Sequence, residues 1–254
     1  MKTKWRFARQ FSLALLAFMI VAPYAAGQPT EPDETAREKT FGPPEKHWAS
    51  LSKNFPVWID LKNKEVIVDG HVCLRAGQLE MFACPAGTKE HESIVAVHAS
   101  AALVHTGLLA VGARPGHPVK FDPVYVPAQG TEVAVLVQWK DAEGKVRSAP
   151  AQSWIRNIRT EKEMAVSWVF GGSGFWIDEE TGERRYLAED GDLICVSNFS
   201  TATLDVPIES SKGADALMFE AFTERIPKKD TAVRLVLTPR LEKKTHGASD
   251  DAAP

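Results

Sequence analysis

The fold is decided around the stretch Cys84-Pro85-Ala86-Gly87-Thr88-Lys89-Glu90-His91-Glu92-Ser93, where a predicted strand gives way to a predicted helix. From about Glu90 the apolar residues recur with the 3.6-residue period of a helix, as at Ile94, Val95, Ala101, Ala102, Leu108 and Leu109. Thr88 can cap the start, and Gly112 can end the helix just after Val111. We therefore predict one main helix, from about Glu90 to Val111.

Three antiparallel strands are predicted before this helix. They cover residues 55–61, 65–74 and 79–84, and short turns separate them. If Leu74 faces Leu79 across the second turn, the third strand pairs with the second. One face of the sheet then carries the polar and sulfur-bearing residues Asp69, His71, Cys73, Glu80 and Cys84, together with Phe82.

Further short strands are predicted downstream. They cover residues 131–140, 145–147, 165–170, 193–196 and 231–237, and a hairpin covers 175–187. The predicted fold class is α+β, a mainly antiparallel short-strand sheet or partial barrel packed on the one main helix.

The N-terminal residues have the three parts of an export signal. Basic residues precede the apolar run 11–22, and small residues follow at 25–27. Because that run is shorter than the roughly 20 residues that span a bilayer, cleavage after Gly27 is preferred over a retained signal anchor. We expect an exported protein, periplasmic or secreted, with no integral membrane segment after cleavage.

Composition divides the rest of the chain into three parts. Residues 28–53 and 240–254 are polar and are predicted to be a disordered linker and a disordered tail. A single domain, 54–239, remains between them. The formal net charge of −3, from 30 basic and 33 acidic residues, leaves no basic stripe for nucleic acid, so no nucleic-acid partner is expected.

The candidate site lies at the predicted corner between strand and helix. A thiol, an imidazole and carboxylates cluster there, and a helix N-terminus favours an anion or a thiolate. The candidate site residues are Cys84, Glu90, His91, Glu92, His71, Cys73 and Glu80. In the predicted register Cys73 and Cys84 lie four residues apart, about 13 Å, which is too far for a disulfide. Cys195, in an apolar run, is interpreted as a buried residue.

Three histidines, His91, His98 and His105, are spaced by seven residues. Seven helical residues advance about 10.5 Å, so the three do not share one ion. His98 and His105 are interpreted as buried imidazoles satisfied by hydrogen bonds. The carboxylates between Asp178 and Asp192 are interpreted as ordinary turn residues, because they lack the spacing of a calcium loop.

Several runs of the sequence resemble the YdjY-type domain. They include His71-Val-Cys73-Leu-Arg75, Leu79-Glu-Met-Phe-Ala-Cys84, Trp168-Val-Phe-Gly-Gly-Ser173 and Gly191-Asp-Leu-Ile-Cys-Val-Ser-Asn198. The resemblance spans roughly residues 50–239 and implies a compact exported bacterial domain, of a family frequent in planctomycetes and without an established activity. Some relatives are labelled ferredoxin-like, but an iron–sulfur cluster is not expected from three cysteines without a C-x₂-C pair.

Three functions remain open at this point. The first is a ligand- or partner-binding accessory domain, whose protein or small-molecule partner is unknown. The second is a thiol redox protein or enzyme that uses a Cys84 thiolate beside His91. The third is a single metal ion held by Cys84, His91 and one of His71, Glu80 or Glu90.

Overall fold

The computed structural model describes residues 40–210 and 217–241, all within one compact unit, Glu31–Pro254. The predicted signal peptide and most of the predicted tail lie outside the described residues. The strands are β1 (Ala49–Ser50), β2 (Val57–Asp60), β3 (Glu65–Val72), β4 (Met81–Pro85), β5 (Ser93–Val97), β6 (Pro115–His117), β7 (Gln129–Gly130), β8 (Glu132–Lys140), β9 (Val146–Pro150), β10 (Ile155–Asn157), β11 (Trp168–Phe170), β12 (Phe175–Ile177), β13 (Arg184–Tyr186), β14 (Ile194–Cys195), β15 (Leu204–Asp205), β16 (Phe219–Ala221) and β17 (Ala232–Pro239). The helical segments are α2 (Ala101–Ala110) and the 3₁₀ turns η1 (Glu90–Glu92), η2 (Ala151–Trp154) and η3 (Leu187–Asp190).

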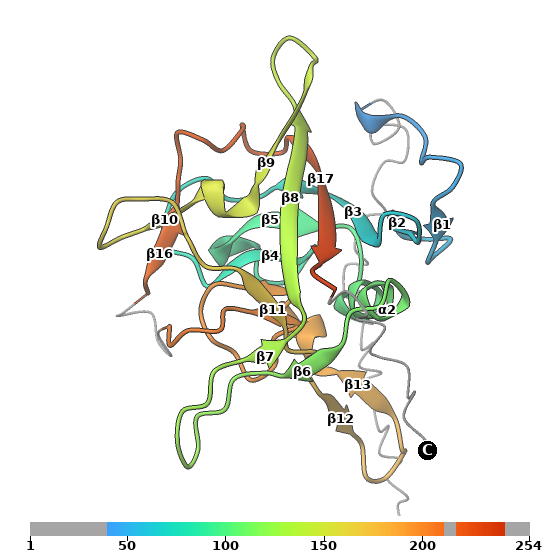
Figure 1. The fold of residues 1–254 in the computed structure, drawn as a ribbon, viewed down its shortest axis with the longest axis vertical. Helices are drawn as coiled ribbons and strands as arrows, with labels where there is room; N and C mark the ends of the chain where they lie inside the picture. Colours follow the sequence, from blue (N-terminus) through green and yellow to red (C-terminus); the bar gives the residue numbers. More distant parts are fainter. Residues whose placement is uncertain (1–39, 211–216, 242–254) are drawn as a thin grey trace, which may run out of the picture. The chain divides into compact units, whose positions relative to one another are not determined.

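Eight strands of the described residues close into a barrel (Figure 1). Their order is β3-β17-β8-β11-β15-β14-β4-β5, and pairing of β5 with β3 completes the circle. β1 and β2 extend the sheet beyond β3, and β9 pairs with β8 outside the barrel path. Two of the barrel pairings, β4–β5 and β14–β15, are parallel. The molecule is therefore mostly β.

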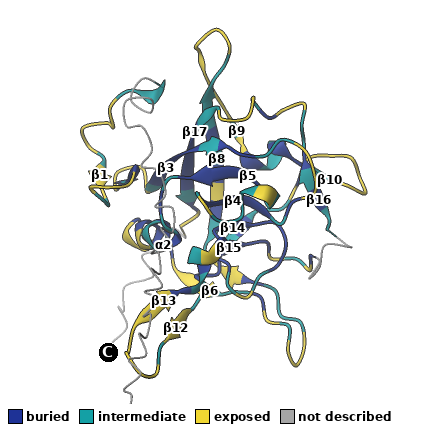
Figure 2. Ribbon diagram, turned by 180° about the vertical axis from the view of Figure 1, so that it is seen from behind, coloured by how far each residue is buried: buried dark blue, intermediate teal, exposed yellow. Residues whose placement is uncertain are grey.

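The inner face of the barrel is a packed core of branched side chains. Burial alternates along β8, because successive side chains point to opposite faces of a strand, whereas residues 66–70 of β3 and 233–237 of β17 are buried at every position. In Figure 2 these strands are dark blue along much of their length. The core residues from them are Val66, Val68, Val72, Val133, Val135, Val137, Val233, Leu235 and Leu237.

The predicted α+β architecture, a sheet packed on a main helix from Glu90 to Val111, is wrong. The first part of that segment is the turn η1 followed by the barrel strand β5, and only its second part is the helix α2. Helix α2 packs against β2, β3 and η3 (Figure 1). Its Gly107 allows the close approach, since a Cβ there would lie 2.9 Å from Val66 Cγ1.

The misassigned residues are those of β5. Every residue of Ser93–Val97 is buried, because β3 and β4 flank the strand and both of its faces are covered. A strand buried on both faces is a continuous apolar run, and periodicity alone does not distinguish it from part of a helix. A true helix starts at Ser100, whose Oγ accepts from the Leu103 N–H at 3.2 Å.

The predicted strand positions are largely confirmed, but one pairing is wrong. The hairpin of β2 and β3 and the hairpin of β12 and β13 form as expected. β4, however, pairs with β5 and β14 and not with β3. The segment between β3 and β4 is no tight turn, since Cys73 N–H donates to Ile94 O at 2.9 Å and Leu79 N–H to Phe219 O at 3.0 Å. Ala49 and Ser50, placed by prediction in the linker, pair with β2.

Candidate functional site

All three thiols are buried and none is in a disulfide. Cys73 Sγ donates to Ser93 O at 3.0 Å. Burial raises the pKa of Cys73 to about 12 and also raises the pKa of Cys84. The pKa of Cys195 is raised well above its ordinary value for the same reason. Burial thus opposes the thiolate form, which is the form that acts as a nucleophile.

Cys84 and His91, predicted to act together, lie in different surroundings. Cys84 is fully buried in β4, whereas the His91 side chain is 78% exposed on η1. The nearest charged partner of His91 is Glu92, whose Oε2 lies 3.9 Å from its Nε2. The Glu90 carboxylate forms a hydrogen bond within its own turn, because its Oε1 accepts from Gly87 N–H at 2.8 Å.

His71 is separated from Cys84 by one intervening strand. Both residues pair with Ala96 of β5, one on each side. Strands in a sheet are about 4.8 Å apart, so the two Cα atoms are about 10 Å apart. The imidazole of His71 stacks on that of His98, with Nδ1 and Nε2 3.4 Å apart. Across residues 40–210 and 217–241, no group of three or more His, Cys, Asp or Glu side chains is arranged to hold a metal ion.

Two predicted carboxylates, Glu80 and Glu92, do come together. Burial, then the charge and hydrogen bond of Glu92, raise the pKa of Glu80. Lys89 joins them: its Nζ lies 3.7 Å from Glu92 Oε1 and 3.0 Å from Asp192 Oδ1. Gly191 packs on the Lys89 stem, where a Cβ would lie 2.5 Å from Cγ. Asp192, interpreted from sequence as a turn residue, is thus part of a half-buried charge cluster with two of the predicted site residues.

The interpretation of His105 as a satisfied buried imidazole agrees with its contacts. Its Nδ1 lies 2.9 Å from the Tyr186 hydroxyl, which also lies 2.9 Å from Thr203 Oγ1. The ring packs edge-on against Phe170. Burial lowers the pKa of His105, so the neutral imidazole is favoured.

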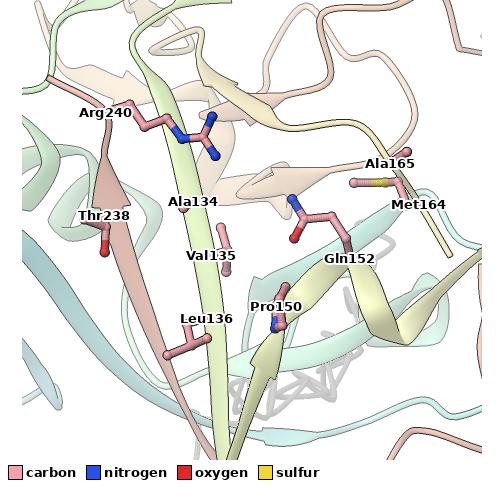
Figure 3. A pocket seen from close by; sticks show the side chains of 9 residues that line it. All are labelled: Ala134, Val135, Leu136, Pro150, Gln152, Met164, Ala165, Thr238 and Arg240. Carbon is pink, nitrogen blue, oxygen red and sulfur yellow. The ribbon is translucent and has the colours of Figure 1, made fainter. Parts of the chain in front are cut away.

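A hollow on the outer face of the barrel is a candidate binding site that the sequence did not indicate. It encloses about 370 Å³ beside β8, β9, η2 and the end of β17. Figure 3 shows Arg240 and Gln152 on opposite sides of it, with their polar heads directed toward the space between them. We call this space the seam hollow. The residues that line it are Ala134, Val135, Leu136, Pro150, Gln152, Met164, Ala165, Thr238 and Arg240.

The seam hollow lies at a gap in the hydrogen bonding of the barrel wall. On one side of β8 the ladder with β11 ends at Val133, and the ladder with β9 begins at Leu136. Thr131 O accepts from Phe170 N–H on this side, and main-chain groups alternate along a strand, so the Val135 N–H also points here. Val135 is 2% exposed, and on this side of β8 its N–H lies between the end of the β11 ladder and the start of the β9 ladder. A buried main-chain donor at such a gap needs an acceptor.

The family model of the YdjY domain matches residues 57–238. The chain belongs to the YdjY domain family. The match runs from β2 to most of β17 and includes the barrel strands, so the seam hollow is almost wholly within it. No curated protein and no solved structure matches the chain. Among the described residues, no helix is long and apolar enough to cross a membrane.

No pattern in the sequence of this YdjY domain predicted that the residues of the seam hollow form a site. Val135 is one valine in a regular strand, and the gap at its N–H follows from two ladders that end on either side of it. Arg240 belongs to the predicted tail, and Gln152 lies between the predicted strands 145–147 and 165–170. Only the pairing of β8 with β9, β11 and β17 brings them to one place.

Proposed function

We propose that this YdjY domain is an exported binding domain that takes a small ligand, or the end of a partner chain, into the seam hollow. The observation that carries the proposal is the gap between the β8–β11 and β8–β9 ladders, where the buried N–H of Val135 points toward the hollow. A ligand that offers an acceptor there would satisfy it. The volume of about 370 Å³ is at the small end of the range for ligand pockets.

The location outside the cytoplasm is part of this proposal and is supported by the composition of residues 1–27. The alternative, a thiol redox or metal protein at Cys84 and His91, has less support. Its thiol is buried with a raised pKa, and its imidazole is exposed on another element. The charge cluster of Glu80, Lys89, Glu92 and Asp192 has internal ion pairs that satisfy much of its charge.

A ligand screen by thermal unfolding tests the proposal. The probes are N-acetyl dipeptides and short aliphatic or aromatic acids, amides and alcohols, added in millimolar excess. A ligand that binds only the folded state raises the melting temperature with its concentration. The control pair is Ala134→Trp, which fills the hollow, and Ala142→Trp, which places the same side chain on the exposed turn between β8 and β9.

We expect at least one probe to raise the melting temperature of the wild type and of the control variant Ala142→Trp. The same probe should leave the melting temperature of Ala134→Trp unchanged. If no probe does so, or if the increase is the same in Ala134→Trp, the seam hollow is not the binding site and the proposal fails.

A further inference from the structure

The polar groups around the seam hollow are mainly hydrogen-bond donors. The Val135 N–H lies at the gap between the two ladders, and Thr238 of the neighbouring strand β17, which carries a hydroxyl, also lines the hollow. Arg240 carries five N–H donors, of which the structure pairs Nη1 with Glu132 Oε1 at 2.8 Å. Gln152 already donates its Nε2 to Val166 O at 3.4 Å. A ligand for this set needs acceptor oxygens.

The rest of the hollow is apolar. Ala134 and Leu136 form its floor on the outer face of β8, and Pro150, Met164 and Ala165 form a wall (Figure 3). Such a surface accommodates one aliphatic side chain next to the polar groups. The ligand therefore combines acceptor oxygens with a small apolar body.

Strand geometry limits how a chain can enter. Val133 and Val137 pair with β11 and β9, and these two residues are about 13 Å apart along β8. Only Val135 lies open between them, so a long strand cannot run along β8 without displacing β9 or β11. A chain end, or a ligand of similar size, can reach the Val135 N–H.

From these observations we infer that the seam hollow recognises a carboxylate next to an aliphatic group, as in the C-terminal residue of a peptide. Arg240 and the Thr238 hydroxyl bind the carboxylate, the Val135 N–H donates to an acceptor oxygen of the ligand, and the side chain packs on Ala134 and Leu136. Arg240 suits this role, because its planar fork binds a carboxylate through two parallel hydrogen bonds. This inference rests on the proposed function and specifies its ligand.

The Glu132 carboxylate opposes an anionic ligand, but it does not close the site. In the Arg240–Glu132 pair the side chains are 67% and 34% exposed, respectively, so the pair is a weak one that a second carboxylate can share or displace. The opposing charge predicts a moderate affinity that salt reduces further.

The test compares acetyl-Ala-Ala-Leu carrying a free carboxylate with the same peptide as a C-terminal amide. Binding to the chain purified after export is measured by isothermal calorimetry and by the NMR shift of the Val135 amide. The variants are Arg240→Gln and the control Arg147→Gln, which removes another exposed, ion-paired arginine at the far hairpin of β8 and β9.

We expect the acid to bind about tenfold or more tightly than the amide, the difference that one charge-assisted interaction makes. The preference should disappear in Arg240→Gln and persist in Arg147→Gln, with the Val135 amide shifting in each complex. Equal binding of acid and amide overturns the carboxylate inference while leaving the hollow as a binding site. Absence of binding by both peptides also overturns it, and the wider ligand screen then decides whether the proposed function fails as well.

Discussion

Arg234 of β17 and Asp69 of β3 form a buried ion pair with two hydrogen bonds. Nε lies 2.6 Å from Oδ1 and Nη2 lies 3.0 Å from Oδ2, and the side chains are 7% and 3% exposed. The guanidinium is surrounded by the aromatic rings of Phe41, Trp48 and Trp58, whose centroids lie 4.7 to 5.5 Å from Arg234 Cζ. The segment before β3 thus covers this pair on the outer face of the barrel.

Replacement of one partner should destabilise the domain strongly. Asp69→Asn leaves the Arg234 charge buried without its counter-ion, and we expect a loss of roughly 3 to 5 kcal/mol in the free energy of unfolding. Urea denaturation at pH 7 measures it. The double variant Asp69→Leu with Arg234→Met, which buries no charge, should recover most of the loss. A small effect of Asp69→Asn would show that water reaches the pair.

Asp205 gives the domain a pH-dependent stability. Burial raises the pKa of Asp205 from 3.8 to about 7, and Asp192 adds a like charge. Its Oδ1 accepts from Asn198 Nδ2 and Val206 N–H, whereas Oδ2 is buried and has no partner within the described residues. The folded state holds the Asp205 proton more tightly than the unfolded state does. The contribution of this proton to the free energy of unfolding is therefore fully present at low pH and is lost as the pH rises from about 4 to 7.

Asp205→Asn should remove this pH dependence. The amide oxygen can keep the two hydrogen bonds of Oδ1 without a charge, so the variant should be more stable than the wild type above pH 7, by roughly 2 to 4 kcal/mol. Below pH 4 the two should be similar. Urea denaturation of both proteins from pH 4 to 8 checks this. Parallel pH profiles would mean that Asp205 is not the titrating group.

The thiols should react slowly in the folded protein. With Cys73, Cys84 and Cys195 buried, a disulfide reagent such as dithionitrobenzoate should modify them only through unfolding. Mass spectrometry should find little modification in native buffer and three modified thiols in denaturant. Rapid reaction of Cys84 in native buffer would restore the thiol redox hypothesis.

Closure of the barrel depends on Gly70. A Cβ at this position would lie 2.3 Å from Ala96 O on β5, a main-chain atom of the strand that completes the circle. Gly70→Ala should therefore reduce the free energy of unfolding by about 3 kcal/mol or more. Gly174→Ala is the control, because the nearest atom to its Cβ is Leu187 Cδ1 at 3.4 Å. If thermal unfolding showed equal and small destabilisation for Gly70→Ala and Gly174→Ala, close packing of β3 against β5 would be contradicted.

Local patterns predicted where most strands lie, since an apolar run bounded by turn residues is decisive for a segment such as 132–140. They did not predict how strands pair. Residues 94–97 are apolar at every position because both faces of β5 are covered, and that composition also fits part of a helix. Once β5 was assigned to a helix, β4 lost its true partner and was paired with β3 instead.

The same limit applies to the candidate sites. Glu80 and Glu92 were identified because they are close in sequence to Cys84, but Asp192, which completes their cluster through Lys89, is about a hundred residues downstream. The gap at the Val135 N–H depends on which strands end beside it, and no feature of a valine indicates that. A site defined by a gap between ladders becomes visible only when the pairing of the strands is known.

The last prediction concerns Glu132, whose carboxylate shares Arg240 with the inferred ligand. Glu132→Gln should tighten binding of acetyl-Ala-Ala-Leu by several-fold, because Arg240 loses its competing partner and the hollow loses an opposing charge. Unfolding stability should change by no more than about 0.5 kcal/mol, since the pair is largely exposed. Binding of the amide peptide should change little. Tightening that is equal for acid and amide, or absent for both, would show that Arg240 does not bind the carboxylate.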